Sequence, residues 1–407
     1  NNWHVYHQYA WVPGLQFYHV FDYKRSINVY SDANLANAQT YGFYRVYYPD
    51  STTRFPTFSK VPTLSYYDYL YNSASTRQEV SFRLIENKFG IKGRYKGFNY
   101  RAHYRQRILS MVENHDLRRL TAQKTSLAID LSNGTSTHRR FENFVGLWLA
   151  YYLKDSTQRA TAEFEYLPLK DFRFKGEIIS KWFSAGYYSV FSSPTFLQQY
   201  YNSNHLRWSN EFERMSSNNV YGQINFETKT VKLLPRLDYH LINNYLYYDT
   251  AAVVRQFASP FSVLRVGGIA EWKPRKFQFI AQTYYTISSN NDIIRIPRFF
   301  ANFRASFDFI YAKVLYLQVG AEIHYKSAYY ADDYMPLTQQ FFLQNRIKTE
   351  GVVYSELFLN ARIKRVRLFV KMANAAQGLL NPGYFSTPYY PVVGRSLGFG
   401  VNWPLFD

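Results

Sequence analysis

Cysteine is absent from the 407 residues of the chain, which excludes a disulfide framework, a thiolate metal site and a thiol nucleophile. Long apolar runs are absent too, since none approaches the roughly eighteen residues that a membrane-spanning helix requires. If the chain crosses a membrane, it therefore crosses as a closed β-barrel, because only helices and closed barrels satisfy every backbone hydrogen bond in hydrocarbon. No stretch has the composition of a linker, so we expect a single domain over residues 1–407.

Aromatic residues take the place of the leucine and alanine that fill ordinary protein cores. The chain has 40 tyrosines and 34 phenylalanines, its aromatic fraction is 20%, and its mean hydropathy is only −0.37. Tyr and Trp favour the boundary between membrane and water, where the ring lies in apolar surroundings and its polar atom meets water. The composition favours the aromatic girdles of a membrane barrel, and the alternative is a soluble all-β protein.

The charge is strongly basic, with a formal net charge of +19. Proteins of this kind usually meet polyanions, which here means nucleic acid, lipopolysaccharide phosphates or acidic solutes. The Lys and Arg residues are spread at every second position of strand-like segments, and no block of the nucleic-acid-binding type stands out. We therefore expect outer-membrane lipid and lipopolysaccharide as partners, and no nucleic acid.

Polar and apolar residues alternate with a period of two in several segments. In residues 314–326 the apolar set, with Val319, faces one side and the polar set, with Glu322, faces the other. The same alternation recurs in residues 98–107 and 172–179, where the polar face carries Arg, His, Lys and Glu. Burying unpaired charges costs several kcal/mol each, so this face must meet water, and the apolar face must meet lipid or a second sheet.

The lengths of the connections favour lipid, because outer-membrane barrels alternate tight periplasmic turns with longer external loops. One connection breaks this rhythm, at residues 168–171, where we expect a short external turn. The predicted tight turns lie near residues 96–97, 154–158, 181–184, 228–230, 273–276, 311–313 and 364–365. The predicted loops lie near residues 24–76, 111–138, 194–217, 249–260, 288–297, 328–351 and 375–394.

The predicted fold class is an all-β, transmembrane, antiparallel up-and-down β-barrel with short periplasmic turns and long external loops. From a first strand at residues 3–23 to a last at residues 395–406 we count about sixteen strands, in a range of about fourteen to eighteen. An even number would return both ends of the series to the periplasmic side. The loop at residues 24–76 is long for a compact domain, and such loops normally cap, constrict or bind.

Several segments resemble the putative porin family of Bacteroidota outer membranes. The resemblance implies a barrel in the outer membrane of a Gram-negative bacterium. It is specific in the second half of the chain and vague before Thr76. The resemblance implies that relatives carry more sequence ahead of the first strand, which leaves open a plug or leader before residue 1. The matching segments are RLIENKFG (residues 83–90) with the following KGFNYRAHYRQR hairpin, FLQQYYNSNHLRW (196–208), residues 314–336, LNARIKRVRLFVK (359–371), YFSTPYYP and the closing LGFGVNW.

The sequence predicts neither a metal site nor a catalytic site. His4 and His7 are three residues apart on a strand, which places them on opposite faces. A histidine on the polar wall of a barrel, such as His240, is more often a hydrogen-bonded wall residue than a ligand. No His and Ser with an orienting amide share the outer face, so we expect no catalytic residue, no cofactor, no metal and no enzyme activity.

The charges that alternation places on the inner face are the candidate site. They could pair with one another or hold a plug, or they could line an ion pathway in which excess Arg and Lys raise the local concentration of anions. The predicted lumen-lining residues are Arg101, His103, Arg105, Arg107, Arg173, Lys175, Glu177, Arg236, Asp238, Arg265, Arg304, Asp308, Glu322, His324, Glu356 and Arg362.

Two functions remain open for such a barrel. The first is a porin-like channel for passive diffusion of small hydrophilic, preferentially anionic solutes. The second is a largely non-conducting barrel that acts as a scaffold in a multiprotein outer-membrane complex. Aromatic external loops at residues 41–48 and 384–391 fit binding of protein partners as easily as constriction. A soluble β protein that binds anionic polymers would instead be extracted without detergent.

Overall fold

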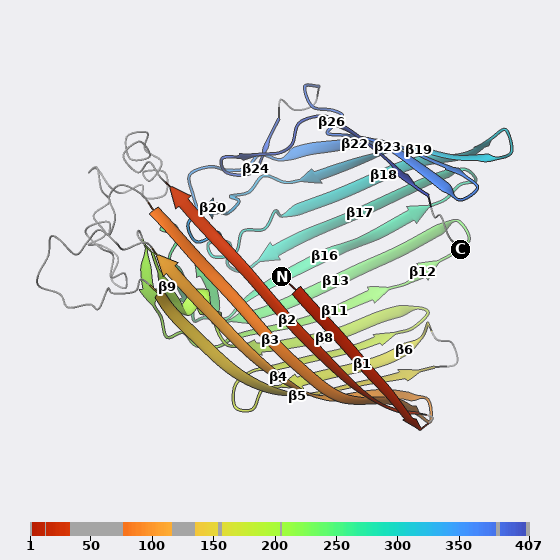
Figure 1. Ribbon diagram of the computed structural model, residues 1–407. Helices are drawn as coiled ribbons and strands as arrows, with labels where there is room; N and C mark the ends of the chain where they lie inside the picture. Colours follow the sequence, from red (N-terminus) through yellow and green to blue (C-terminus); the bar gives the residue numbers. More distant parts are fainter. Residues whose placement is uncertain are drawn as a thin grey trace, which may run out of the picture.

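A single large antiparallel sheet dominates the computed structural model, which describes residues 2–12, 14–32, 76–115, 135–153, 157–203, 206–379 and 383–403 (Figure 1). Its strands are β1 (Asn2–Val12), β2 (Leu15–Asp32), β3 (Thr76–Tyr95), β4 (Phe98–His115), β5 (Thr135–Tyr152), β6 (Arg159–Tyr166), β7 (Phe172–Ile179), β8 (Phe183–Ser192), β11 (Met215–Ile224), β12 (Phe226–Glu227), β13 (Val231–Asn243), β16 (Phe261–Trp272), β17 (Phe277–Ser288), β18 (Phe299–Tyr311), β19 (Leu315–Lys326), β22 (Val352–Ile363), β23 (Val366–Ala373) and β26 (Ser396–Asn402). Each strand pairs with the next in this series, except that β11 and β12 both pair with β13, so the sheet is an up-and-down meander that curves around an interior.

The number of crossings differs from the predicted sixteen. β11 and β12 both pair with β13 and form one interrupted crossing, so the eighteen strands of the sheet make seventeen crossings. The additional one arises at the start, because the expected strand at residues 3–23 is the hairpin of β1 and β2, in which His4 pairs with Asp22. Gly14 makes the turn with a φ of 91°, and a Cβ there would lie 2.8 Å from the carbonyl oxygen of Arg94.

Six of the seven predicted tight turns are confirmed, whereas residues 154–156 of the seventh lie outside the described residues. The confirmed turns share one end of the sheet, opposite the long connections (Figure 1). Two residues join β3 to β4 and β22 to β23, and the backbone there has positive φ at Lys96 and Lys364. The exception at residues 168–171 is confirmed as well, because only a short turn joins β6 to β7. The other long-end connections in the described residues contain α3 (Phe196–Gln199), β9 (Tyr200–Asn202), β10 (Arg207–Ser209), β14 (Tyr245–Tyr248), β15 (Val254–Phe257), β20 (Asp333–Met335), β21 (Gln340–Phe342), β24 (Phe385–Thr387) and β25 (Tyr390–Pro391).

Strands β2 to β5 are much longer than their neighbours. They have 18 to 20 residues, whereas β6, β7 and β8 have 8 to 10. β2 continues to Asp32 in unbroken register with β3, so the connection expected at residues 24–76 begins later than predicted. Residues 33–75, including the aromatic segment 41–48, lie outside the described residues.

The two faces of the sheet differ as the alternation predicts. Along β5, Phe141 is 67% exposed, whereas the next residue, Glu142, is 5% exposed and Phe144 is 6% exposed. Cross-strand partners point to the same side of a sheet, so the register extends this division across all crossings. One face is an apolar outer surface, and the other is a polar inner wall. Among the described residues, no helix is long and apolar enough to cross a membrane.

The edges of the sheet are β1 and β26, and within the described residues they do not pair with each other. β1 enters the hairpin turn at Gly14 and therefore runs toward the tight-turn end. β26 follows a long connection and also runs toward that end, so the two edges are parallel. The expected return of both ends of the strand series to the tight-turn side is therefore wrong, because the additional hairpin makes the number of crossings odd.

Candidate functional site

The inner wall of β3 to β7 is built around one buried carboxylate. Glu165 on β6 accepts a hydrogen bond from Arg105 Nη2 at 2.7 Å, lies 3.1 Å from His103 Nε2 and lies 3.4 Å from Arg173 Nη2. Arg105 also contacts Glu86 at 3.3 Å. Bonds between ionised partners are stronger than neutral ones, so one carboxylate holds cations from two other strands in place.

A second row of the same wall pairs Arg107 with acidic neighbours. The register places Glu86, Arg107 and Glu142 side by side on β3, β4 and β5. Arg107 Nη2 lies 2.6 Å from Glu142, whose side chain is 6% exposed. The guanidinium groups of Arg105 and Arg107 also lie 4.2 and 4.9 Å from the ring centroid of Phe144, a cation–π arrangement that fixes their orientation.

A third group links β7 to β16 across β11 and β13. Tyr221 donates a short hydrogen bond to Glu177, and the guanidinium of Arg236 lies 4.0 Å from the Tyr221 ring. Asp238, which is 2% exposed, accepts bonds from Arg236 at 2.8 and 2.9 Å and from Arg265 at 3.2 Å. This carboxylate therefore neutralises part of the charge of two arginines that face the interior.

Glu322, His324 and Glu356 come together on β19 and β22, close enough to be considered as metal ligands. Asn302 Nδ2 lies 2.8 Å from Glu322 Oε1 and 3.0 Å from His324 Nδ1. The Asn302 amide thus occupies both Glu322 and the Nδ1 side of His324, and His324 Nε2 lies 3.5 Å from Glu322 Oε1.

The second carboxylate of this cluster already has partners. Lys371 Nζ lies 2.6 Å from Glu356 Oε2, and the Tyr354 hydroxyl donates to Glu356 Oε1 at 2.9 Å. The charge and the hydrogen-bonding capacity of the cluster are therefore satisfied by side chains. The arrangement fits a hydrogen-bonded wall better than a metal site.

Several inward cations form no ion pair with a described residue. Arg101 instead lies 5.1 Å from the Trp148 ring, Arg304 lies 4.5 Å from Phe358, and Arg362 lies 4.5 Å from Tyr316. Lys175 lines an open hollow of about 360 Å³ beside Glu163, Arg173 and Tyr188. These side chains leave an excess of positive charge on the inner wall.

Three long connections fold back onto the inner face and form what we call the cap, residues 193–203, 206–214, 244–260 and 327–351. Its side chains pack against Val80 and Met111, at the outer ends of β3 and β4, in one apolar cluster. The buried cap residues of this cluster are Phe196, Tyr201, Leu206, Trp208, Leu246, Tyr248, Ala252, Val254, Met335, Leu337 and Phe342. Burying a large apolar side chain contributes about 1.5 to 3 kcal/mol, so the cap is a folded body.

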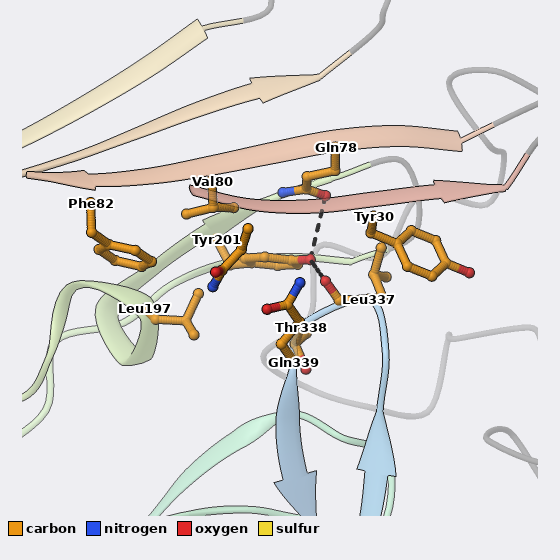
Figure 2. A pocket seen from close by; sticks show the side chains of 10 residues that line it. Tyr30, Gln78, Val80, Phe82, Leu197, Tyr201, Leu337, Thr338 and Gln339 are labelled. Carbon is orange, nitrogen blue, oxygen red and sulfur yellow. Dashed lines mark hydrogen bonds between the residues drawn. The ribbon is translucent and has the colours of Figure 1, made fainter. Parts of the chain in front are cut away.

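Tyr201 is the centre of the contact between the cap and the wall. Figure 2 shows its ring between α3 and the residues of β3, with its hydroxyl directed at two acceptors. These are Leu337 O at 2.9 Å and Gln78 Oε1 at 3.4 Å, while Gln78 Nε2 donates to Asn202 O at 2.9 Å. A single tyrosine thus joins two cap connections to strand β3.

Charged groups complete the attachment of the cap. Glu113 on β4 is 1% exposed and accepts a hydrogen bond from Asn202 N at 3.1 Å. Arg140 on β5 donates to Pro194 O at 2.7 Å, and its guanidinium lies 4.6 Å from the ring of Phe196. Within the cap, burial raises the pKa of the Asp332 carboxyl to about 6, against the opposing effect of Arg295.

The structure places all sixteen predicted lumen residues on one face, as the register of their strands shows. It gathers most of them into the groups around Glu165, Asp238 and Glu322, whereas Asp308 stands apart, opposite Gln318. The sequence-based list omitted Glu86 and Glu142, whose pairing with Arg105 and Arg107 depends on the register. It also omitted the whole cap, although the aromatic segment at residues 196–208 was one of the segments that carried the family resemblance.

The fold is similar to that of solved outer-membrane proteins. The copper transporter OprC aligns with a TM-score of 0.63 at 10% identity, over 98% of this chain and 64% of that one. The ferric enterobactin receptor PfeA of Pseudomonas aeruginosa gives 0.61 at 11% identity, over 98% and 60%. The ferric preacinetobactin receptor BauA of Acinetobacter baumannii gives 0.53 at 10% identity, over 97% and 60%. The chain thus spans about three fifths of the length of these proteins, and identities this low establish the fold alone.

Sequence comparison supplies the family. No curated protein matches the chain. Its entire length, residues 1–407, does match one protein family, which is described as Putative porin. The chain therefore belongs to the Putative porin family, and it resides in the outer membrane of a Gram-negative bacterium.

Proposed function

We propose that the chain forms the wall of a channel through which small hydrophilic, preferentially anionic solutes diffuse passively. The observation that carries this proposal is the inner wall, where Arg101, Lys175, Arg304 and Arg362 face the interior without an ion pair to a described residue. Cations that line a water-filled passage raise the local concentration of anions. The proposal includes no catalytic step, no cofactor and no nucleic-acid partner.

The channel requires a closed barrel, and we propose one that retains the antiparallel pattern. Because β1 and β26 run in the same direction, they cannot pair with each other in an antiparallel ladder. An odd number of further crossings between them would close the wall and remove both free edges. One crossing would make eighteen, the upper limit of the range expected from the sequence.

The cap acts in this proposal as the constriction of the channel. It attaches to the outer ends of β3, β4 and β5 through Gln78, Glu113 and Arg140, on the long-connection side of the wall. The three groups of paired charges lie deeper along the same wall. A solute entering from outside would therefore meet the cap first and the basic wall afterwards.

The test is single-channel recording of the detergent-purified protein in a planar bilayer under a salt gradient. We expect stable conductance steps and a reversal potential of anion-selective sign. The variant R101Q/K175Q/R362Q should move the reversal potential toward the cation side, because three interior charges are removed. R77Q is the matched control, since Arg77 lies on the outer face of β3 and should not affect selectivity. Cation selectivity of the wild-type protein would refute the proposal.

The second candidate function is a scaffold that conducts little. The observation in its favour is the cap, whose buried cluster joins three connections and β3 in one packed body. A correctly folded protein that gives no conductance steps and copurifies with stoichiometric partners would support this function over the channel. Partners that contact the external loops and an origin in the Bacteroidota remain predictions.

A further inference from the structure

Charged side chains on the outer face of the sheet are confined to one sector, which holds four arginines and the carboxylate of Glu79. Register and alternation assign the Lys and Arg residues of the described strands to the inner face, with four exceptions on β2, β3 and β5. These exceptions are Arg25, Arg77, Arg83 and Arg139, and all four are exposed. A charge that faces lipid is costly at the centre of the membrane and inexpensive at its boundary. The position of these arginines relative to the membrane therefore decides their role.

Three of the four form a single row across neighbouring strands. Arg25 on β2 pairs with Arg83 on β3, Arg83 pairs with Ser110 on β4, and Ser110 pairs with Arg139 on β5. Like charges directly opposite each other in a sheet are destabilising, as Arg25 and Arg83 are here. We call Arg25, Arg83 and Arg139 the arginine row, and an anion bound beside this row would be attracted by all three guanidinium groups.

The apolar belt below the row has the height of a membrane. Its lower edge is the aromatic row of Tyr95, Phe98 and Tyr151, which are 63%, 48% and 40% exposed. On β3 to β5 the belt is apolar except for one row of amides, Asn87, Gln106 and Asn143. Its upper edge is the row just above them, which contains Ile85 and Phe141, ten residues further along β3 and β5. Ten residues of a tilted strand rise about 25 Å, the height of the apolar band of outer-membrane barrels.

The arginine row is the next outward row above this belt. Two residues of a tilted strand rise about 5 Å, so the guanidinium groups stand at the level of the lipid head groups on the external side. Directly beneath them, the side chains of Tyr23, Ile85, Ile108 and Phe141 offer an apolar surface for acyl chains. The surface thus combines a cationic upper part with an apolar lower part, and it faces away from the channel.

We propose that the arginine row binds the phosphate groups of lipopolysaccharide in the outer leaflet. A phosphorylated glycolipid has an anionic head and acyl chains, and it would occupy both parts of this surface at once. Guanidinium groups bind phosphate in bidentate geometry, which favours Arg over Lys at such a site. A free phosphate or a dissolved polyanion would use the cationic part alone.

The test measures binding of purified rough-type lipopolysaccharide to the full chain in phosphatidylethanolamine nanodiscs. A basic residue beside an anionic membrane surface contributes about fivefold in binding, so R25Q/R83Q/R139Q should weaken the affinity by about a hundredfold. R77Q is the control, because Arg77 is also exposed and outward but lies six residues beyond the row on β3. It should change the affinity by less than about twofold, because its distance from the head groups exceeds a Debye length.

Two further arms identify the ligand. Dephosphorylated lipopolysaccharide should bind the wild-type protein as weakly as intact lipid binds the triple variant, and millimolar inorganic phosphate should not displace the intact lipid. R25K/R83K/R139K keeps the charges and should retain most of the affinity. R83Q alone should lose about fivefold in affinity, and this single variant tests the proposal if the triple glutamine variant does not fold. The proposal is overturned if R77Q weakens binding as much as R83Q, if dephosphorylated lipid binds equally well, or if inorganic phosphate displaces the lipid.

Discussion

Replacing Trp208 by alanine should open the cap without unfolding the wall. The Trp208 ring lies 4.6 Å from Tyr201 and 6.3 Å from Tyr248, its Nε1 donates to Leu197 O at 2.9 Å, and the residue is 3% exposed. Truncating a buried Trp to Ala costs about 3 to 5 kcal/mol, mostly through the cavity that remains. Because Trp208 contacts only cap residues in these interactions, the loss falls on the cap.

That loss corresponds to a rise of about a hundredfold to a few thousandfold in the equilibrium constant for local opening. Hydrogen exchange measures it directly. The amides of Asn202, Leu206 and Asn210, which are bonded to Glu113, Ser203 and Gln199, should exchange faster by that factor, while those of β16 to β19 should not change. If the cap constricts the channel, single-channel conductance should rise in the same variant.

The matched control is W182A, because Trp182 is 66% exposed in the tight turn between β7 and β8, at the end of the sheet opposite the cap. It removes a side chain of the same size and should leave both the cap amides and the conductance unchanged. Unaltered exchange in W208A would show that the cluster around Trp208 does not hold the cap. Faster exchange without a change in conductance would preserve the folded cap and refute its role as a constriction.

Three further predictions concern the cap, the edge and the wall. Because burial raises the pKa of Asp332 to about 6, the folded cap binds a proton there more tightly than the unfolded cap, so this group stabilises the cap at about pH 4 and loses that contribution as pH rises through about 6. In D332N the pH dependence of cap-amide exchange, corrected for the intrinsic exchange rate, should become smaller, whereas the part due to Asp333 and Glu113, whose pKa values burial also raises, should remain; an identical profile would contradict the role of Asp332. If a further strand lies between β1 and β26, the V5C/F399C pair should not form a disulfide on oxidation. The control is V5C/F21C, whose two residues are direct cross-strand partners on β1 and β2 and should form one. Efficient linkage of the first pair would exclude the proposed closure. D238N should increase anion selectivity in the bilayer assay, because it removes the carboxylate that neutralises two arginines. An unchanged reversal potential would show that this group lies off the ion path.

The faces of the strands were predictable from the sequence, because alternation is a local property of the chain. Arg101 to Arg107 lie on one face of β4 whatever strand lies beside them, and the structure places them together. The turn at Gly14 also had a local signal, since the preceding residue is proline and a Pro-Gly pair marks turns. The predicted single strand over residues 3–23 conflicts with this signal, because it merges β1 with β2 and gives an even number of strands.

The partners of the charges were not predictable in the same way. Glu86, Arg107 and Glu142 come from three strands, and a shift of register by two residues would pair each with a different neighbour without changing its face. The cap depends on contacts over still greater separations, as between Tyr201 and Gln78 or Leu337. Its segments show no periodicity of their own, so only the folded wall determines which of them meet.

The unequal lengths of the strands give the described wall an uneven rim. β5 has 18 residues and its neighbour β6 has 8, and their ladder ends where Val145 pairs with Tyr166. Ten residues of a tilted strand correspond to about 25 Å. Strands β2 to β5 therefore extend about 25 Å beyond β6, β7 and the short turn between them. In the proposed channel, the wall is thus lower beside the basic hollow at Lys175 than on the side of β2 to β5.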